Sequence, residues 1–414
     1  MRVMLSTIGS RGDVQPLVAL ALALRALGQD VRLCVPPDFQ EGIESLGFPV
    51  TPIGPPLRPA AAPNPPGRPT PARMRELAEA SVHAQFDTLL AATRGCDLLV
   101  GATALQIAAP SVAEALTIPY VFTAYCPIVL PSAHHAPPPT PGAPEPSPGV
   151  AFADLWAQNA QQVNGLFGAA LNARRASLGL GAITSVRDHV LTETPWLACD
   201  PVLGPWPGDA MPGPQAGGEA VPDRVFQPGA WVVPDDRPLS PEITAFLDAG
   251  APPVYFGLGS MRDPGGASRA MIEAARSSGR RVILSRGWAG LDPIDDAPDC
   301  LTIGEVNQQA LFPRMAAVVH HGGAGTTTAT ALSGAPQVIV PQSYDQYYWA
   351  SRVQSLGVGT GHPTAAPTAA SLTAALSRAL RPDVAAAASA LAPAIRRDGA
   401  AVAAQHLVSV AAAA

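Results

Sequence analysis

Residues 317–340, AVVHHGGAGTTTATALSGAPQVIV, contain the pattern that decides the fold of this chain. The apolar run 317–320 predicts a short buried strand, and residues 322–325 form a glycine-rich loop. Residues 326–333 predict a helix, and the apolar run 337–340 predicts the next strand. Strand, helix and strand in this order predict neighbouring parallel strands with helices packed on the sheet.

The same alternation extends upstream through the C-terminal half. Strands are expected at 254–258, 281–285 and 300–303, with a helix near 265–279. Upstream of these elements, a stretch rich in proline and glycine from 205 to 222 is typical of an interdomain linker. The C-terminal half is therefore expected to form one doubly wound α/β domain.

The N-terminal half repeats this organisation. Residues 2–8 predict a buried strand, and residues 9–13 a loop. Pro16 is expected to open a helix that Gly28 closes, because proline suits a first helical turn and glycine suits the position after the last. With the next strand at 31–35, the chain predicts an α/β fold class with two separate doubly wound sheets.

Composition excludes several classes of protein. The chain has 414 residues, of which 47% are hydrophobic, so it is long and apolar enough for two folded domains. The formal net charge is −6 without any basic run, so nucleic acid is not an expected partner. No apolar run reaches roughly 18 residues, so no membrane insertion is expected. Five scattered cysteines without C-x-x-C spacing predict free thiols and a cytoplasmic location.

One candidate site lies in the first strand-to-helix loop, Gly9-Ser10-Arg11-Gly12-Asp13. In open α/β sheets ligands bind outside the carboxyl ends of strands, where this loop is expected. Its small residues let a ligand approach the backbone. Asp13 could cap the following helix or act as a general base. The pattern is not G-x-G-x-x-G, so the dinucleotide fingerprint of an NAD enzyme is absent.

Two loops of the C-terminal half favour an anion. In Gly257-Leu258-Gly259-Ser260, the hydroxyl and the backbone N–H groups could hold phosphate, or they could simply cap a helix. His320 and His321 enter a glycine loop that opens a helix, whose free N–H groups and dipole attract negative charge. An imidazole there could stabilise a leaving pyrophosphate; the alternative is a histidine satisfied in the core.

The pair Asp345-Gln346 follows the next predicted strand. A carboxylate beside an amide is suited to gripping sugar hydroxyls, with helix capping as the alternative. No Asp-x-Asp occurs anywhere in the chain, so a sugar-nucleotide enzyme that holds Mg²⁺ through such carboxylates is not indicated. No metal and no cofactor are predicted.

These motifs, in this order, resemble the GT-B glycosyltransferases that decorate glycopeptide-antibiotic aglycones of the vancomycin type. The opening Gly-Ser-Arg-Gly-Asp-Val-Gln-Pro is also similar to that of sterol glycosyltransferases. The resemblance covers essentially the whole chain, in the stretches Gly9–Leu20, Val35–Asp38, Tyr125–Pro127, Pro195–Leu203, Gly229–Trp231, Ala245–Gly250, Leu284–Trp288, Gly304–Asn307, His320–Thr326, Asp345-Gln346 and Arg397–Ala400.

The resemblance implies a GT-B fold, in which two Rossmann-like domains face a central cleft. Residues 1–205 would form the acceptor-binding domain, 206–222 the linker, and 223–395 the nucleotide-sugar-binding domain. Residues 396–414 would form a final helix that packs back on the N-terminal domain. A monomer or weak dimer is expected.

The resemblance also implies a reaction, the inverting and metal-independent transfer of a sugar from a dTDP- or UDP-sugar to a hydroxyl of a natural-product aglycone. By motif match Asp13 would be the base that deprotonates this hydroxyl. The remaining site residues implied are Gly9, Ser10, Arg11 and Gly12 in the cleft loop, Ser260, His321, Gly322, Gly323, Gly325 and Thr326 at the pyrophosphate, Asp345 and Gln346 at the sugar, and Arg286, Trp288 and Val306 at the nucleoside.

Three other functions fit the same architecture. The first is a glycosyltransferase for a polyketide or sterol-like acceptor. The second is a sugar-nucleotide epimerase, which needs no acceptor base at the position of Asp13. The third is a non-catalytic helper that binds nucleotide sugars, for which a missing base or a broken donor loop is expected. Both features are intact in this chain.

Overall fold

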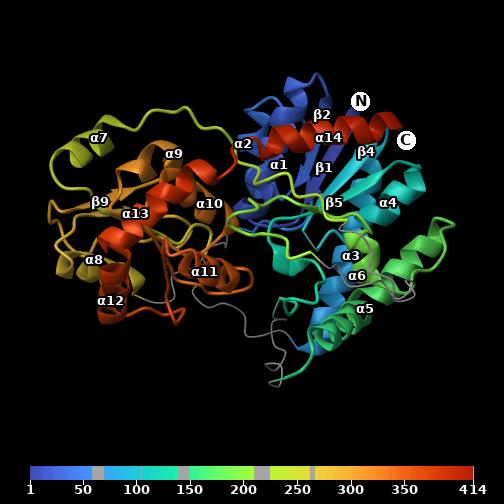
Figure 1. The fold of residues 1–414 in the computed structure, drawn as a ribbon. Coiled ribbons are helices and arrows are strands. Elements are labelled where there is room, and N and C mark those ends of the chain that lie inside the picture. The colour runs from blue at the N-terminus through green and yellow to red at the C-terminus, as the bar shows by residue number, and fades with distance from the viewer. Residues whose placement is uncertain (58–69, 104, 139–148, 209–223, 262–265, 414) are drawn as a thin grey trace. The chain divides into compact units, whose positions relative to one another are not determined.

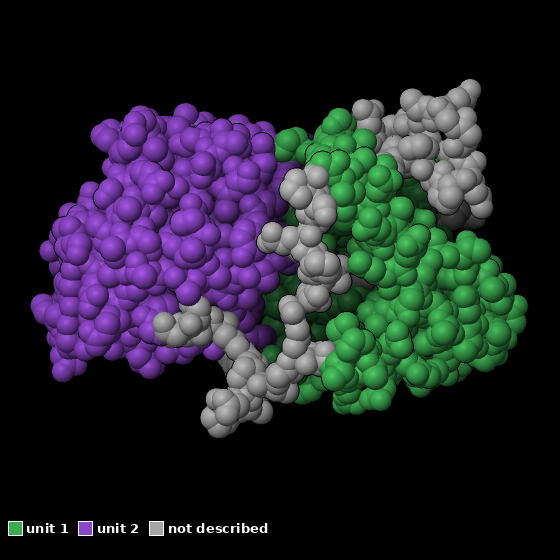
Figure 2. Space-filling view, turned by 90° about the horizontal axis from the view of Figure 1, so that it is seen from below, with its two compact units in different colours: residues 1–199, 205–231, 397–414 green, residues 200–204, 232–396 purple. Residues whose placement is uncertain are grey.

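The computed structural model describes residues 1–57, 70–103, 105–138, 149–208, 224–261 and 266–413. The chain forms two compact units, coloured in Figure 2. Unit 1 comprises residues 1–199, 205–231 and 397–414, and unit 2 comprises residues 200–204 and 232–396. Most of the expected linker, residues 209–222, lies outside the described residues.

Unit 1 is built on a parallel sheet, drawn in blue to green in Figure 1. In the described part of the chain the sheet has six strands in the order β3-β2-β1-β4-β5-β6. This is the strand order of a doubly wound dinucleotide-binding fold, whose ligand crevice opens between β1 and β4. The strands are β1 (Arg2–Thr7), β2 (Asp30–Val35), β3 (Val50–Pro52), β4 (Leu98–Ala102), β5 (Tyr120–Ala124) and β6 (Trp196–Leu197).

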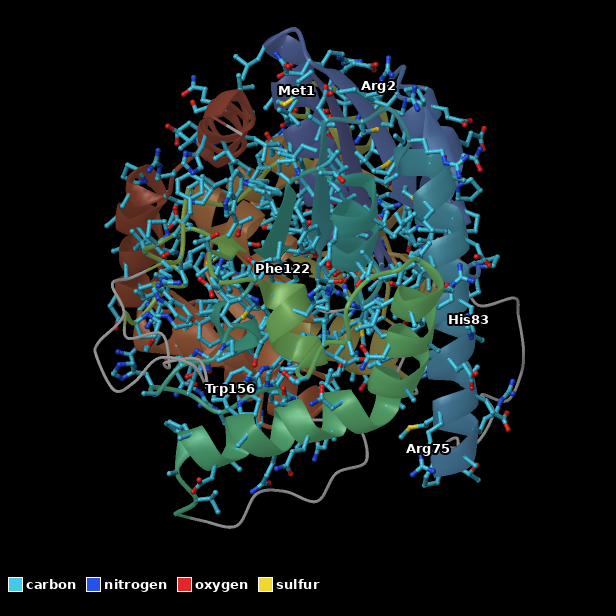
Figure 3. All side chains as sticks on the ribbon, turned by 90° about the vertical axis from the view of Figure 1, so that its right-hand side faces the viewer. Met1, Arg2, Arg75, His83, Phe122 and Trp156 are labelled. Atoms are coloured by element: carbon cyan, nitrogen blue, oxygen red, sulfur yellow. The ribbon has the colours of Figure 1, made fainter. Side chains whose placement is uncertain are left out.

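Helices cover the unit 1 sheet, and the last helix of the chain belongs to this unit. That helix, α14, packs against α1, so the first and the last helix of the chain lie side by side in unit 1. Phe122 of β5 and Trp156 of α5 are buried in the interior (Figure 3). The helices are α1 (Arg11–Ala26), η1 (Pro37–Phe39), α2 (Gln40–Glu44), α3 (Pro71–Thr93), α4 (Ala109–Leu116), η2 (Pro127–Val129), α5 (Phe152–Ser177), α6 (Val186–Leu191) and α14 (Gly399–Ala413).

Helix α1 begins at Arg11, five residues before Pro16. The prediction that Pro16 opens this helix is therefore wrong. Ser10 takes the N-cap position, and its carbonyl oxygen accepts the N–H groups of Asp13 at 2.9 Å and Val14 at 3.1 Å. A proline is tolerated inside the helix this close to its N-terminus. Asp13 consequently lies in the first helical turn instead of in a loop.

Unit 2 repeats the plan. Its described residues form six parallel strands in the order β12-β11-β10-β7-β8-β9, with the ligand crevice expected between β7 and β10. The strands are β7 (Val254–Gly257), β8 (Val282–Ser285), β9 (Cys300–Ile303), β10 (Ala317–His320), β11 (Gln337–Ile339) and β12 (Gly359–Gly361). The helices are α7 (Pro241–Asp248), α8 (Ala267–Ser277), α9 (Gln308–Leu311), η3 (Phe312–Arg314), α10 (Ala324–Ser333), α11 (Gln346–Ser355), α12 (Ala369–Ala379), α13 (Pro382–Leu391) and η4 (Ala392–Ala394).

Both faces of the unit 2 sheet are buried. Val254 and Phe256 of β7 belong to one core cluster, with Val319 of β10, and Tyr255 belongs to the other, with Val318. This division follows from the alternation of side chains along a strand. Each fully buried apolar side chain contributes about 1.5–3 kcal/mol, so the apolar runs predicted from sequence also hold the sheet in place.

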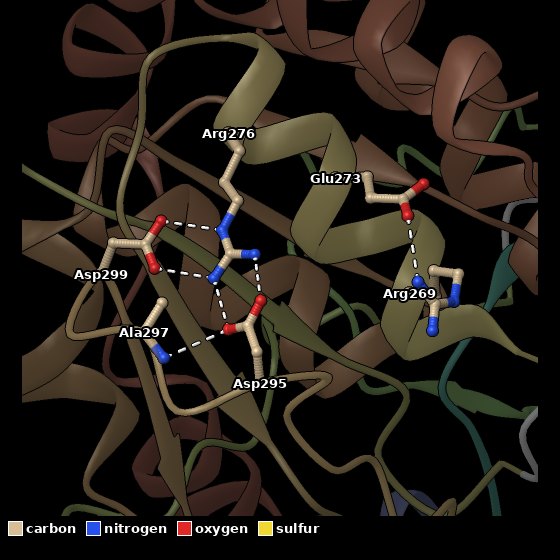
Figure 4. A network of polar contacts seen from close by, with 6 residues as sticks. All are labelled: Arg269, Glu273, Arg276, Asp295, Ala297 and Asp299. Carbon is tan, nitrogen blue, oxygen red and sulfur yellow. Dashed lines mark hydrogen bonds and ion pairs between the residues drawn. The ribbon is translucent and has the colours of Figure 1, made fainter.

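An arginine on α8 fixes the connection that leads into β9 (Figure 4). Arg276 donates to both carboxylate oxygens of Asp295 at 2.6 and 2.7 Å, and to both of Asp299 at 2.8 Å. The guanidinium lowers the pKa of the Asp295 carboxyl to about 2. Ion pairs near the surface stabilise little, so the main effect of this network is to position the connection.

Two further observations complete the fold. In the described part of the chain, no helix is long and apolar enough to cross a membrane. All five cysteines carry free thiols, and four of them are buried.

Candidate active site

Asp13 occupies the first turn of α1 beside the carboxyl end of β1. Its carboxylate oxygen Oδ2 accepts a hydrogen bond from the Ser10 hydroxyl at 3.3 Å. Gly9 makes room for this carboxylate, because a Cβ at position 9 would lie 2.3 Å from the Asp13 Cγ. Gly9 and the N-cap Ser10 therefore pack against the Asp13 side chain, while Arg11 and Gly12 belong to the same first helical turn as Asp13.

The environment of Asp13 suits a base. Burial raises the pKa of its carboxyl to about 6, although the hydrogen bonds from Ser10 act in the opposite direction. A carboxylate with a pKa near the working pH combines a large ionised fraction with greater basicity than an ordinary aspartate. The helix dipole alone would favour the charged form, so desolvation is the larger effect here.

The two adjacent histidines have different environments. His320 is fully buried in β10, where Nδ1 accepts the Gly322 N–H at 3.1 Å and Nε2 lies 2.9 Å from the Gln337 Oε1. Because Nδ1 accepts a hydrogen bond, Nε2 carries the proton in the neutral ring. Burial lowers the pKa of His320 to about 3. His320 is thus a core histidine whose two ring nitrogens both have protein partners, which is the alternative to an anion-binding role that the motif left open.

His321 faces the glycine loops instead. A Cβ at Gly323 would lie 2.6 Å from its Nε2, and a Cβ at Gly259 would lie 2.8 Å from its Cε1. Gly259 has φ of +59°, and Gly287 with φ of +51° approaches the Gly259 carbonyl so closely that a Cβ would lie 2.6 Å away. The loops after β7 and β10 therefore meet at one imidazole, the loop after β8 packs against the β7 loop, and only glycine fits at these contacts.

His321 is available for a ligand. Burial lowers its pKa to about 4, so the ring is neutral at physiological pH. Its Nδ1 is buried and has no hydrogen-bond partner among the described residues. A buried nitrogen without a partner costs free energy unless a ligand or water satisfies it.

The N-terminus of α10 lies next to His321. Gly323 is the N-cap residue and its helix carries no side-chain cap, so the first N–H groups of α10 are open to an anion. Gly322, with φ of +94°, turns the chain into this helix, and Gly325 and Thr326 belong to its first turn. Ser260 lies in the turn that follows β7, the strand paired with β10.

Asp345 and Gln346 occupy the start of α11, after β11. The Asp345 Oδ2 accepts the indole N–H of the buried Trp349 at 3.0 Å. The Gln346 Oε1 accepts the N–H groups of Gln342 at 2.7 Å and Ser343 at 3.2 Å. These contacts fix the loop between β11 and α11. The Gln346 side-chain nitrogen carries two hydrogens. One of them is directed at the Met261 sulfur, 3.6 Å away, and the other remains for a ligand.

The residues predicted at the nucleoside follow the next two strands. Arg286 and Trp288 follow β8, where Arg286 N–H donates to the Ile303 carbonyl at 3.0 Å and Trp288 N–H to the Gly259 carbonyl at 2.9 Å. The Arg286 side chain is exposed, at 61%. Val306 follows β9 and packs on the core cluster that contains Tyr255.

The candidate residues of unit 2 lie along one edge of one sheet. Because all its strands are parallel, their carboxyl ends meet at the same edge. Along that edge, the residues expected at the sugar follow β11, those expected at the pyrophosphate follow β10 and β7, and those expected at the nucleoside follow β8 and β9. This spatial order is the covalent order of a nucleotide sugar, although the order in the sequence is different.

The prediction omitted residues that shape this site by close approach. Gly259 approaches the His321 ring, Gly287 approaches the Gly259 backbone, and Met261 contacts Gln346. Gly259 was visible in the Gly257–Ser260 motif, whereas nothing in the sequence distinguishes Gly287 or Met261. Among the described residues, no group of three or more His, Cys, Asp or Glu side chains could hold a metal ion.

Two units with this strand order, each with candidate residues at its switch point, fit a glycosyltransferase of the GT-B class. Residues 3–134 match the glycosyltransferase family 28 N-terminal domain, and residues 281–404 match the erythromycin biosynthesis protein CIII-like C-terminal domain. The solved glycotransferase of kitacinnamycin superposes with a TM-score of 0.71 at 20% identity, over 99% of this chain and 98% of that one.

Similar protein sequences identify the family. Glycosyltransferase GtfE of Amycolatopsis orientalis is 48% identical, over 98% of this chain and 97% of that protein. The vancomycin aglycone glucosyltransferase of the same organism is 47% identical, over 99% of this chain and 97% of that protein. The chain belongs to the vancomycin-type family of GT-B glycosyltransferases.

Proposed function

We propose that the protein transfers a sugar from a dTDP- or UDP-sugar to a hydroxyl of a glycopeptide aglycone, with inversion and without a metal ion. The observation that carries the proposal is the order of candidate groups along the unit 2 sheet edge, which matches sugar, diphosphate and nucleoside. The glycopeptide acceptor, rather than a polyketide or a sterol, is supported by the relative that acts on vancomycin aglycone.

Each unit has its own part in the proposed reaction. In unit 2, the N–H groups of α10, Ser260, His321 and Thr326 hold the diphosphate, and Asp345 and Gln346 contact the sugar. In unit 1, Asp13 accepts the proton of the acceptor hydroxyl. The resulting oxygen attacks the anomeric carbon while the bond to the diphosphate breaks, and the nucleoside diphosphate leaves with both bonding electrons.

The His321 imidazole acts on the leaving group. As a neutral ring it donates its one N–H to a diphosphate oxygen, where negative charge increases as the glycosidic bond breaks. The helix N-terminus adds partial positive charge at the same place. These fixed dipoles stabilise the negative charge of the leaving diphosphate, as a bound cation does in other sugar-nucleotide enzymes.

Calorimetric titration of dTDP and UDP tests the donor site without any knowledge of the acceptor. With EDTA present, at least one of them is expected to bind with a micromolar Kd, because the diphosphate groups of the site are backbone N–H and imidazole. The preferred nucleotide identifies the donor. Binding that appears only after Mg²⁺ is added would contradict metal independence. No binding with or without acceptor would remove the donor assignment.

The activity is expected to depend on the ionisation of Asp13. Because its pKa is raised to about 6, kcat should fall about tenfold for each pH unit below that value as the base becomes protonated. A pH–rate profile at saturating substrates measures this acid limb. A limb near pH 4, the ordinary range of an aspartate, would contradict the raised pKa of Asp13.

A further inference from the structure

Tyr125 contacts Asp13 within unit 1. It follows β5 directly, is 9% exposed, and its hydroxyl donates a hydrogen bond to the main-chain carbonyl oxygen of Asp13 at 3.1 Å. This contact joins two segments 112 residues apart in the sequence. None of the functional assignments above uses Tyr125.

The first turn of α1 needs support from outside. Pro16 has no N–H, so the carbonyl oxygen of Gly12 receives no helical hydrogen bond from it. The N-cap Ser10 gives no side-chain cap, because its hydroxyl is directed to the Asp13 carboxylate. The turn that carries Asp13 is therefore held less firmly by its own helix than an ordinary first turn.

Tyr125 is itself held by a row of aromatic rings. Its ring lies edge-on to Trp231 with centroids 6.2 Å apart, and Trp231 lies edge-on to Trp196 at 6.5 Å. Phe226 contacts Trp196 at 4.9 Å and His406 of α14 at 4.2 Å. The pairs other than Phe226–His406, which is tilted, are edge-to-face, and such pairs at these separations are favourable and fix ring orientation.

The final helix closes on the segment that carries Trp231. A Cβ at Gly399, the first residue of α14, would lie 2.5 Å from the Ala230 carbonyl oxygen and 2.6 Å from the Gly229 carbonyl carbon. Only glycine permits this approach. The return of the chain to unit 1 therefore completes the packing around the Tyr125 ring.

We propose that Tyr125 is the positioning residue of Asp13, and that its hydroxyl holds the first turn of α1 so that the carboxylate keeps its orientation and stays out of water. This inference rests on the proposed role of Asp13 as the base. Catalysis is sensitive to such placement, because a displacement of about 1 Å can cost about 10²-fold in rate.

Tyr125→Phe tests the proposal, with Tyr120→Phe as the matched control. Tyr120 begins β5, the strand that Tyr125 follows, and its buried hydroxyl sits over Gly101 without a hydrogen-bond partner among the described residues. Both variants lose one buried hydroxyl, but only Tyr125→Phe loses the contact with Asp13. For transfer from a nucleotide glucose to vancomycin aglycone, Tyr125→Phe should lower kcat about tenfold and Tyr120→Phe less than about twofold. The Kd of the nucleoside diphosphate should not change.

A second readout is independent of turnover. A ¹³C NMR titration of carboxyl-labelled aspartate, assigned with Asp13→Asn, follows the ionisation of Asp13 directly. Burial is the main cause of the raised Asp13 pKa; the Ser10 hydroxyl bonds its carboxylate and the Tyr125 hydroxyl bonds its main-chain carbonyl oxygen. In Tyr125→Phe the loosened turn should admit water, and the pKa should fall by about one unit, with no shift in Tyr120→Phe.

The outcomes separate the two proposals. Equal titrations and equal kcat in the two variants would overturn the positioning role. A shifted titration together with full turnover of Asp13→Asn would keep the role of Tyr125 and reject Asp13 as the base. Should Tyr125→Phe fail to fold, Trp231→Phe, which loosens the packing of the Tyr125 ring and of Trp196 but keeps the Tyr125 hydroxyl, is expected to shift the titration in the same direction, and an unshifted titration would again overturn the proposal.

Discussion

Asp13→Asn is expected to abolish transfer while donor binding stays intact. A positioned base contributes about 10²–10⁴-fold, so kcat should fall by this factor, which corresponds to about 3–5 kcal/mol. Asparagine has the same shape and can still accept a hydrogen bond from Ser10, but its amide cannot take up a proton. The proposed donor groups all belong to unit 2, so the Kd of the nucleoside diphosphate should be unchanged.

The same variant should not lose stability. The folded-state pKa of Asp13 lies above that of an unfolded aspartate, so its ionisation costs folding free energy that rises as pH passes from about 4 to about 6. At neutral pH this cost is at most about 3 kcal/mol, and Asn removes it. A melting temperature equal to or above that of the parent therefore accompanies the loss of activity, which separates a catalytic defect from misfolding.

Asp30→Asn is the control for Asp13→Asn. Asp30 begins β2, at the opposite edge of the same sheet, and pairs on the surface with Arg2. Its replacement should leave kcat within about twofold, because surface ion pairs contribute little. Turnover of Asp13→Asn at the level of this control would remove Asp13 from the role of base.

His321→Ala is expected to lower kcat by about 10²-fold, or about 3 kcal/mol, by analogy with the loss of an oxyanion-hole donor. In the proposed role the imidazole supplies an N–H to the diphosphate oxygens, and its removal leaves a space between Gly259 and Gly323 that water can fill. The effect on kcat should exceed the effect on the Kd of the nucleoside diphosphate, because charge on the leaving group grows in the transition state. Single-turnover kinetics with saturating donor measure the chemical step.

His320→Ala supplies the contrast from the adjacent position. Its imidazole holds the Gly322 N–H and contacts Gln337, so its loss leaves buried polar groups without partners at a cost of about 1–3 kcal/mol each. This variant should lower the melting temperature, whereas His321→Ala should leave it nearly unchanged. A kcat of His321→Ala within about twofold of the parent would contradict the proposed contact with the diphosphate.

Local sequence was sufficient for most of the architecture. Apolar runs such as 317–320, and their alternation with helices, predicted both parallel sheets, because a strand buried on both faces must be continuously apolar. Helix boundaries were predicted less well from the sequence. The start of α1 depends on Ser10 taking the N-cap position, and Pro16 alone gave the wrong start.

The sequence predicted which loops carry the candidate site, but not how their side chains are arranged in space. The sequence marked both histidines of the motif, yet only the tertiary structure separates their roles: Gln337 satisfies His320, while His321 lies between Gly259 and Gly323. The contact between Tyr125 and Asp13 is likewise invisible in the sequence, because nothing local links the two segments.

The sequence by itself determined the fold class, the loops that follow strands, and the residue types that suit a diphosphate, a sugar and a base. These properties follow from short-range patterns of polarity and turn formation. Only the tertiary structure decided which loops are neighbours, because strand order, and not chain order, sets that: β10 lies beside β7, so the His321 loop meets the Gly259 loop. Burial, which raises the pKa of Asp13 and lowers that of His321, likewise depends on segments distant in the chain.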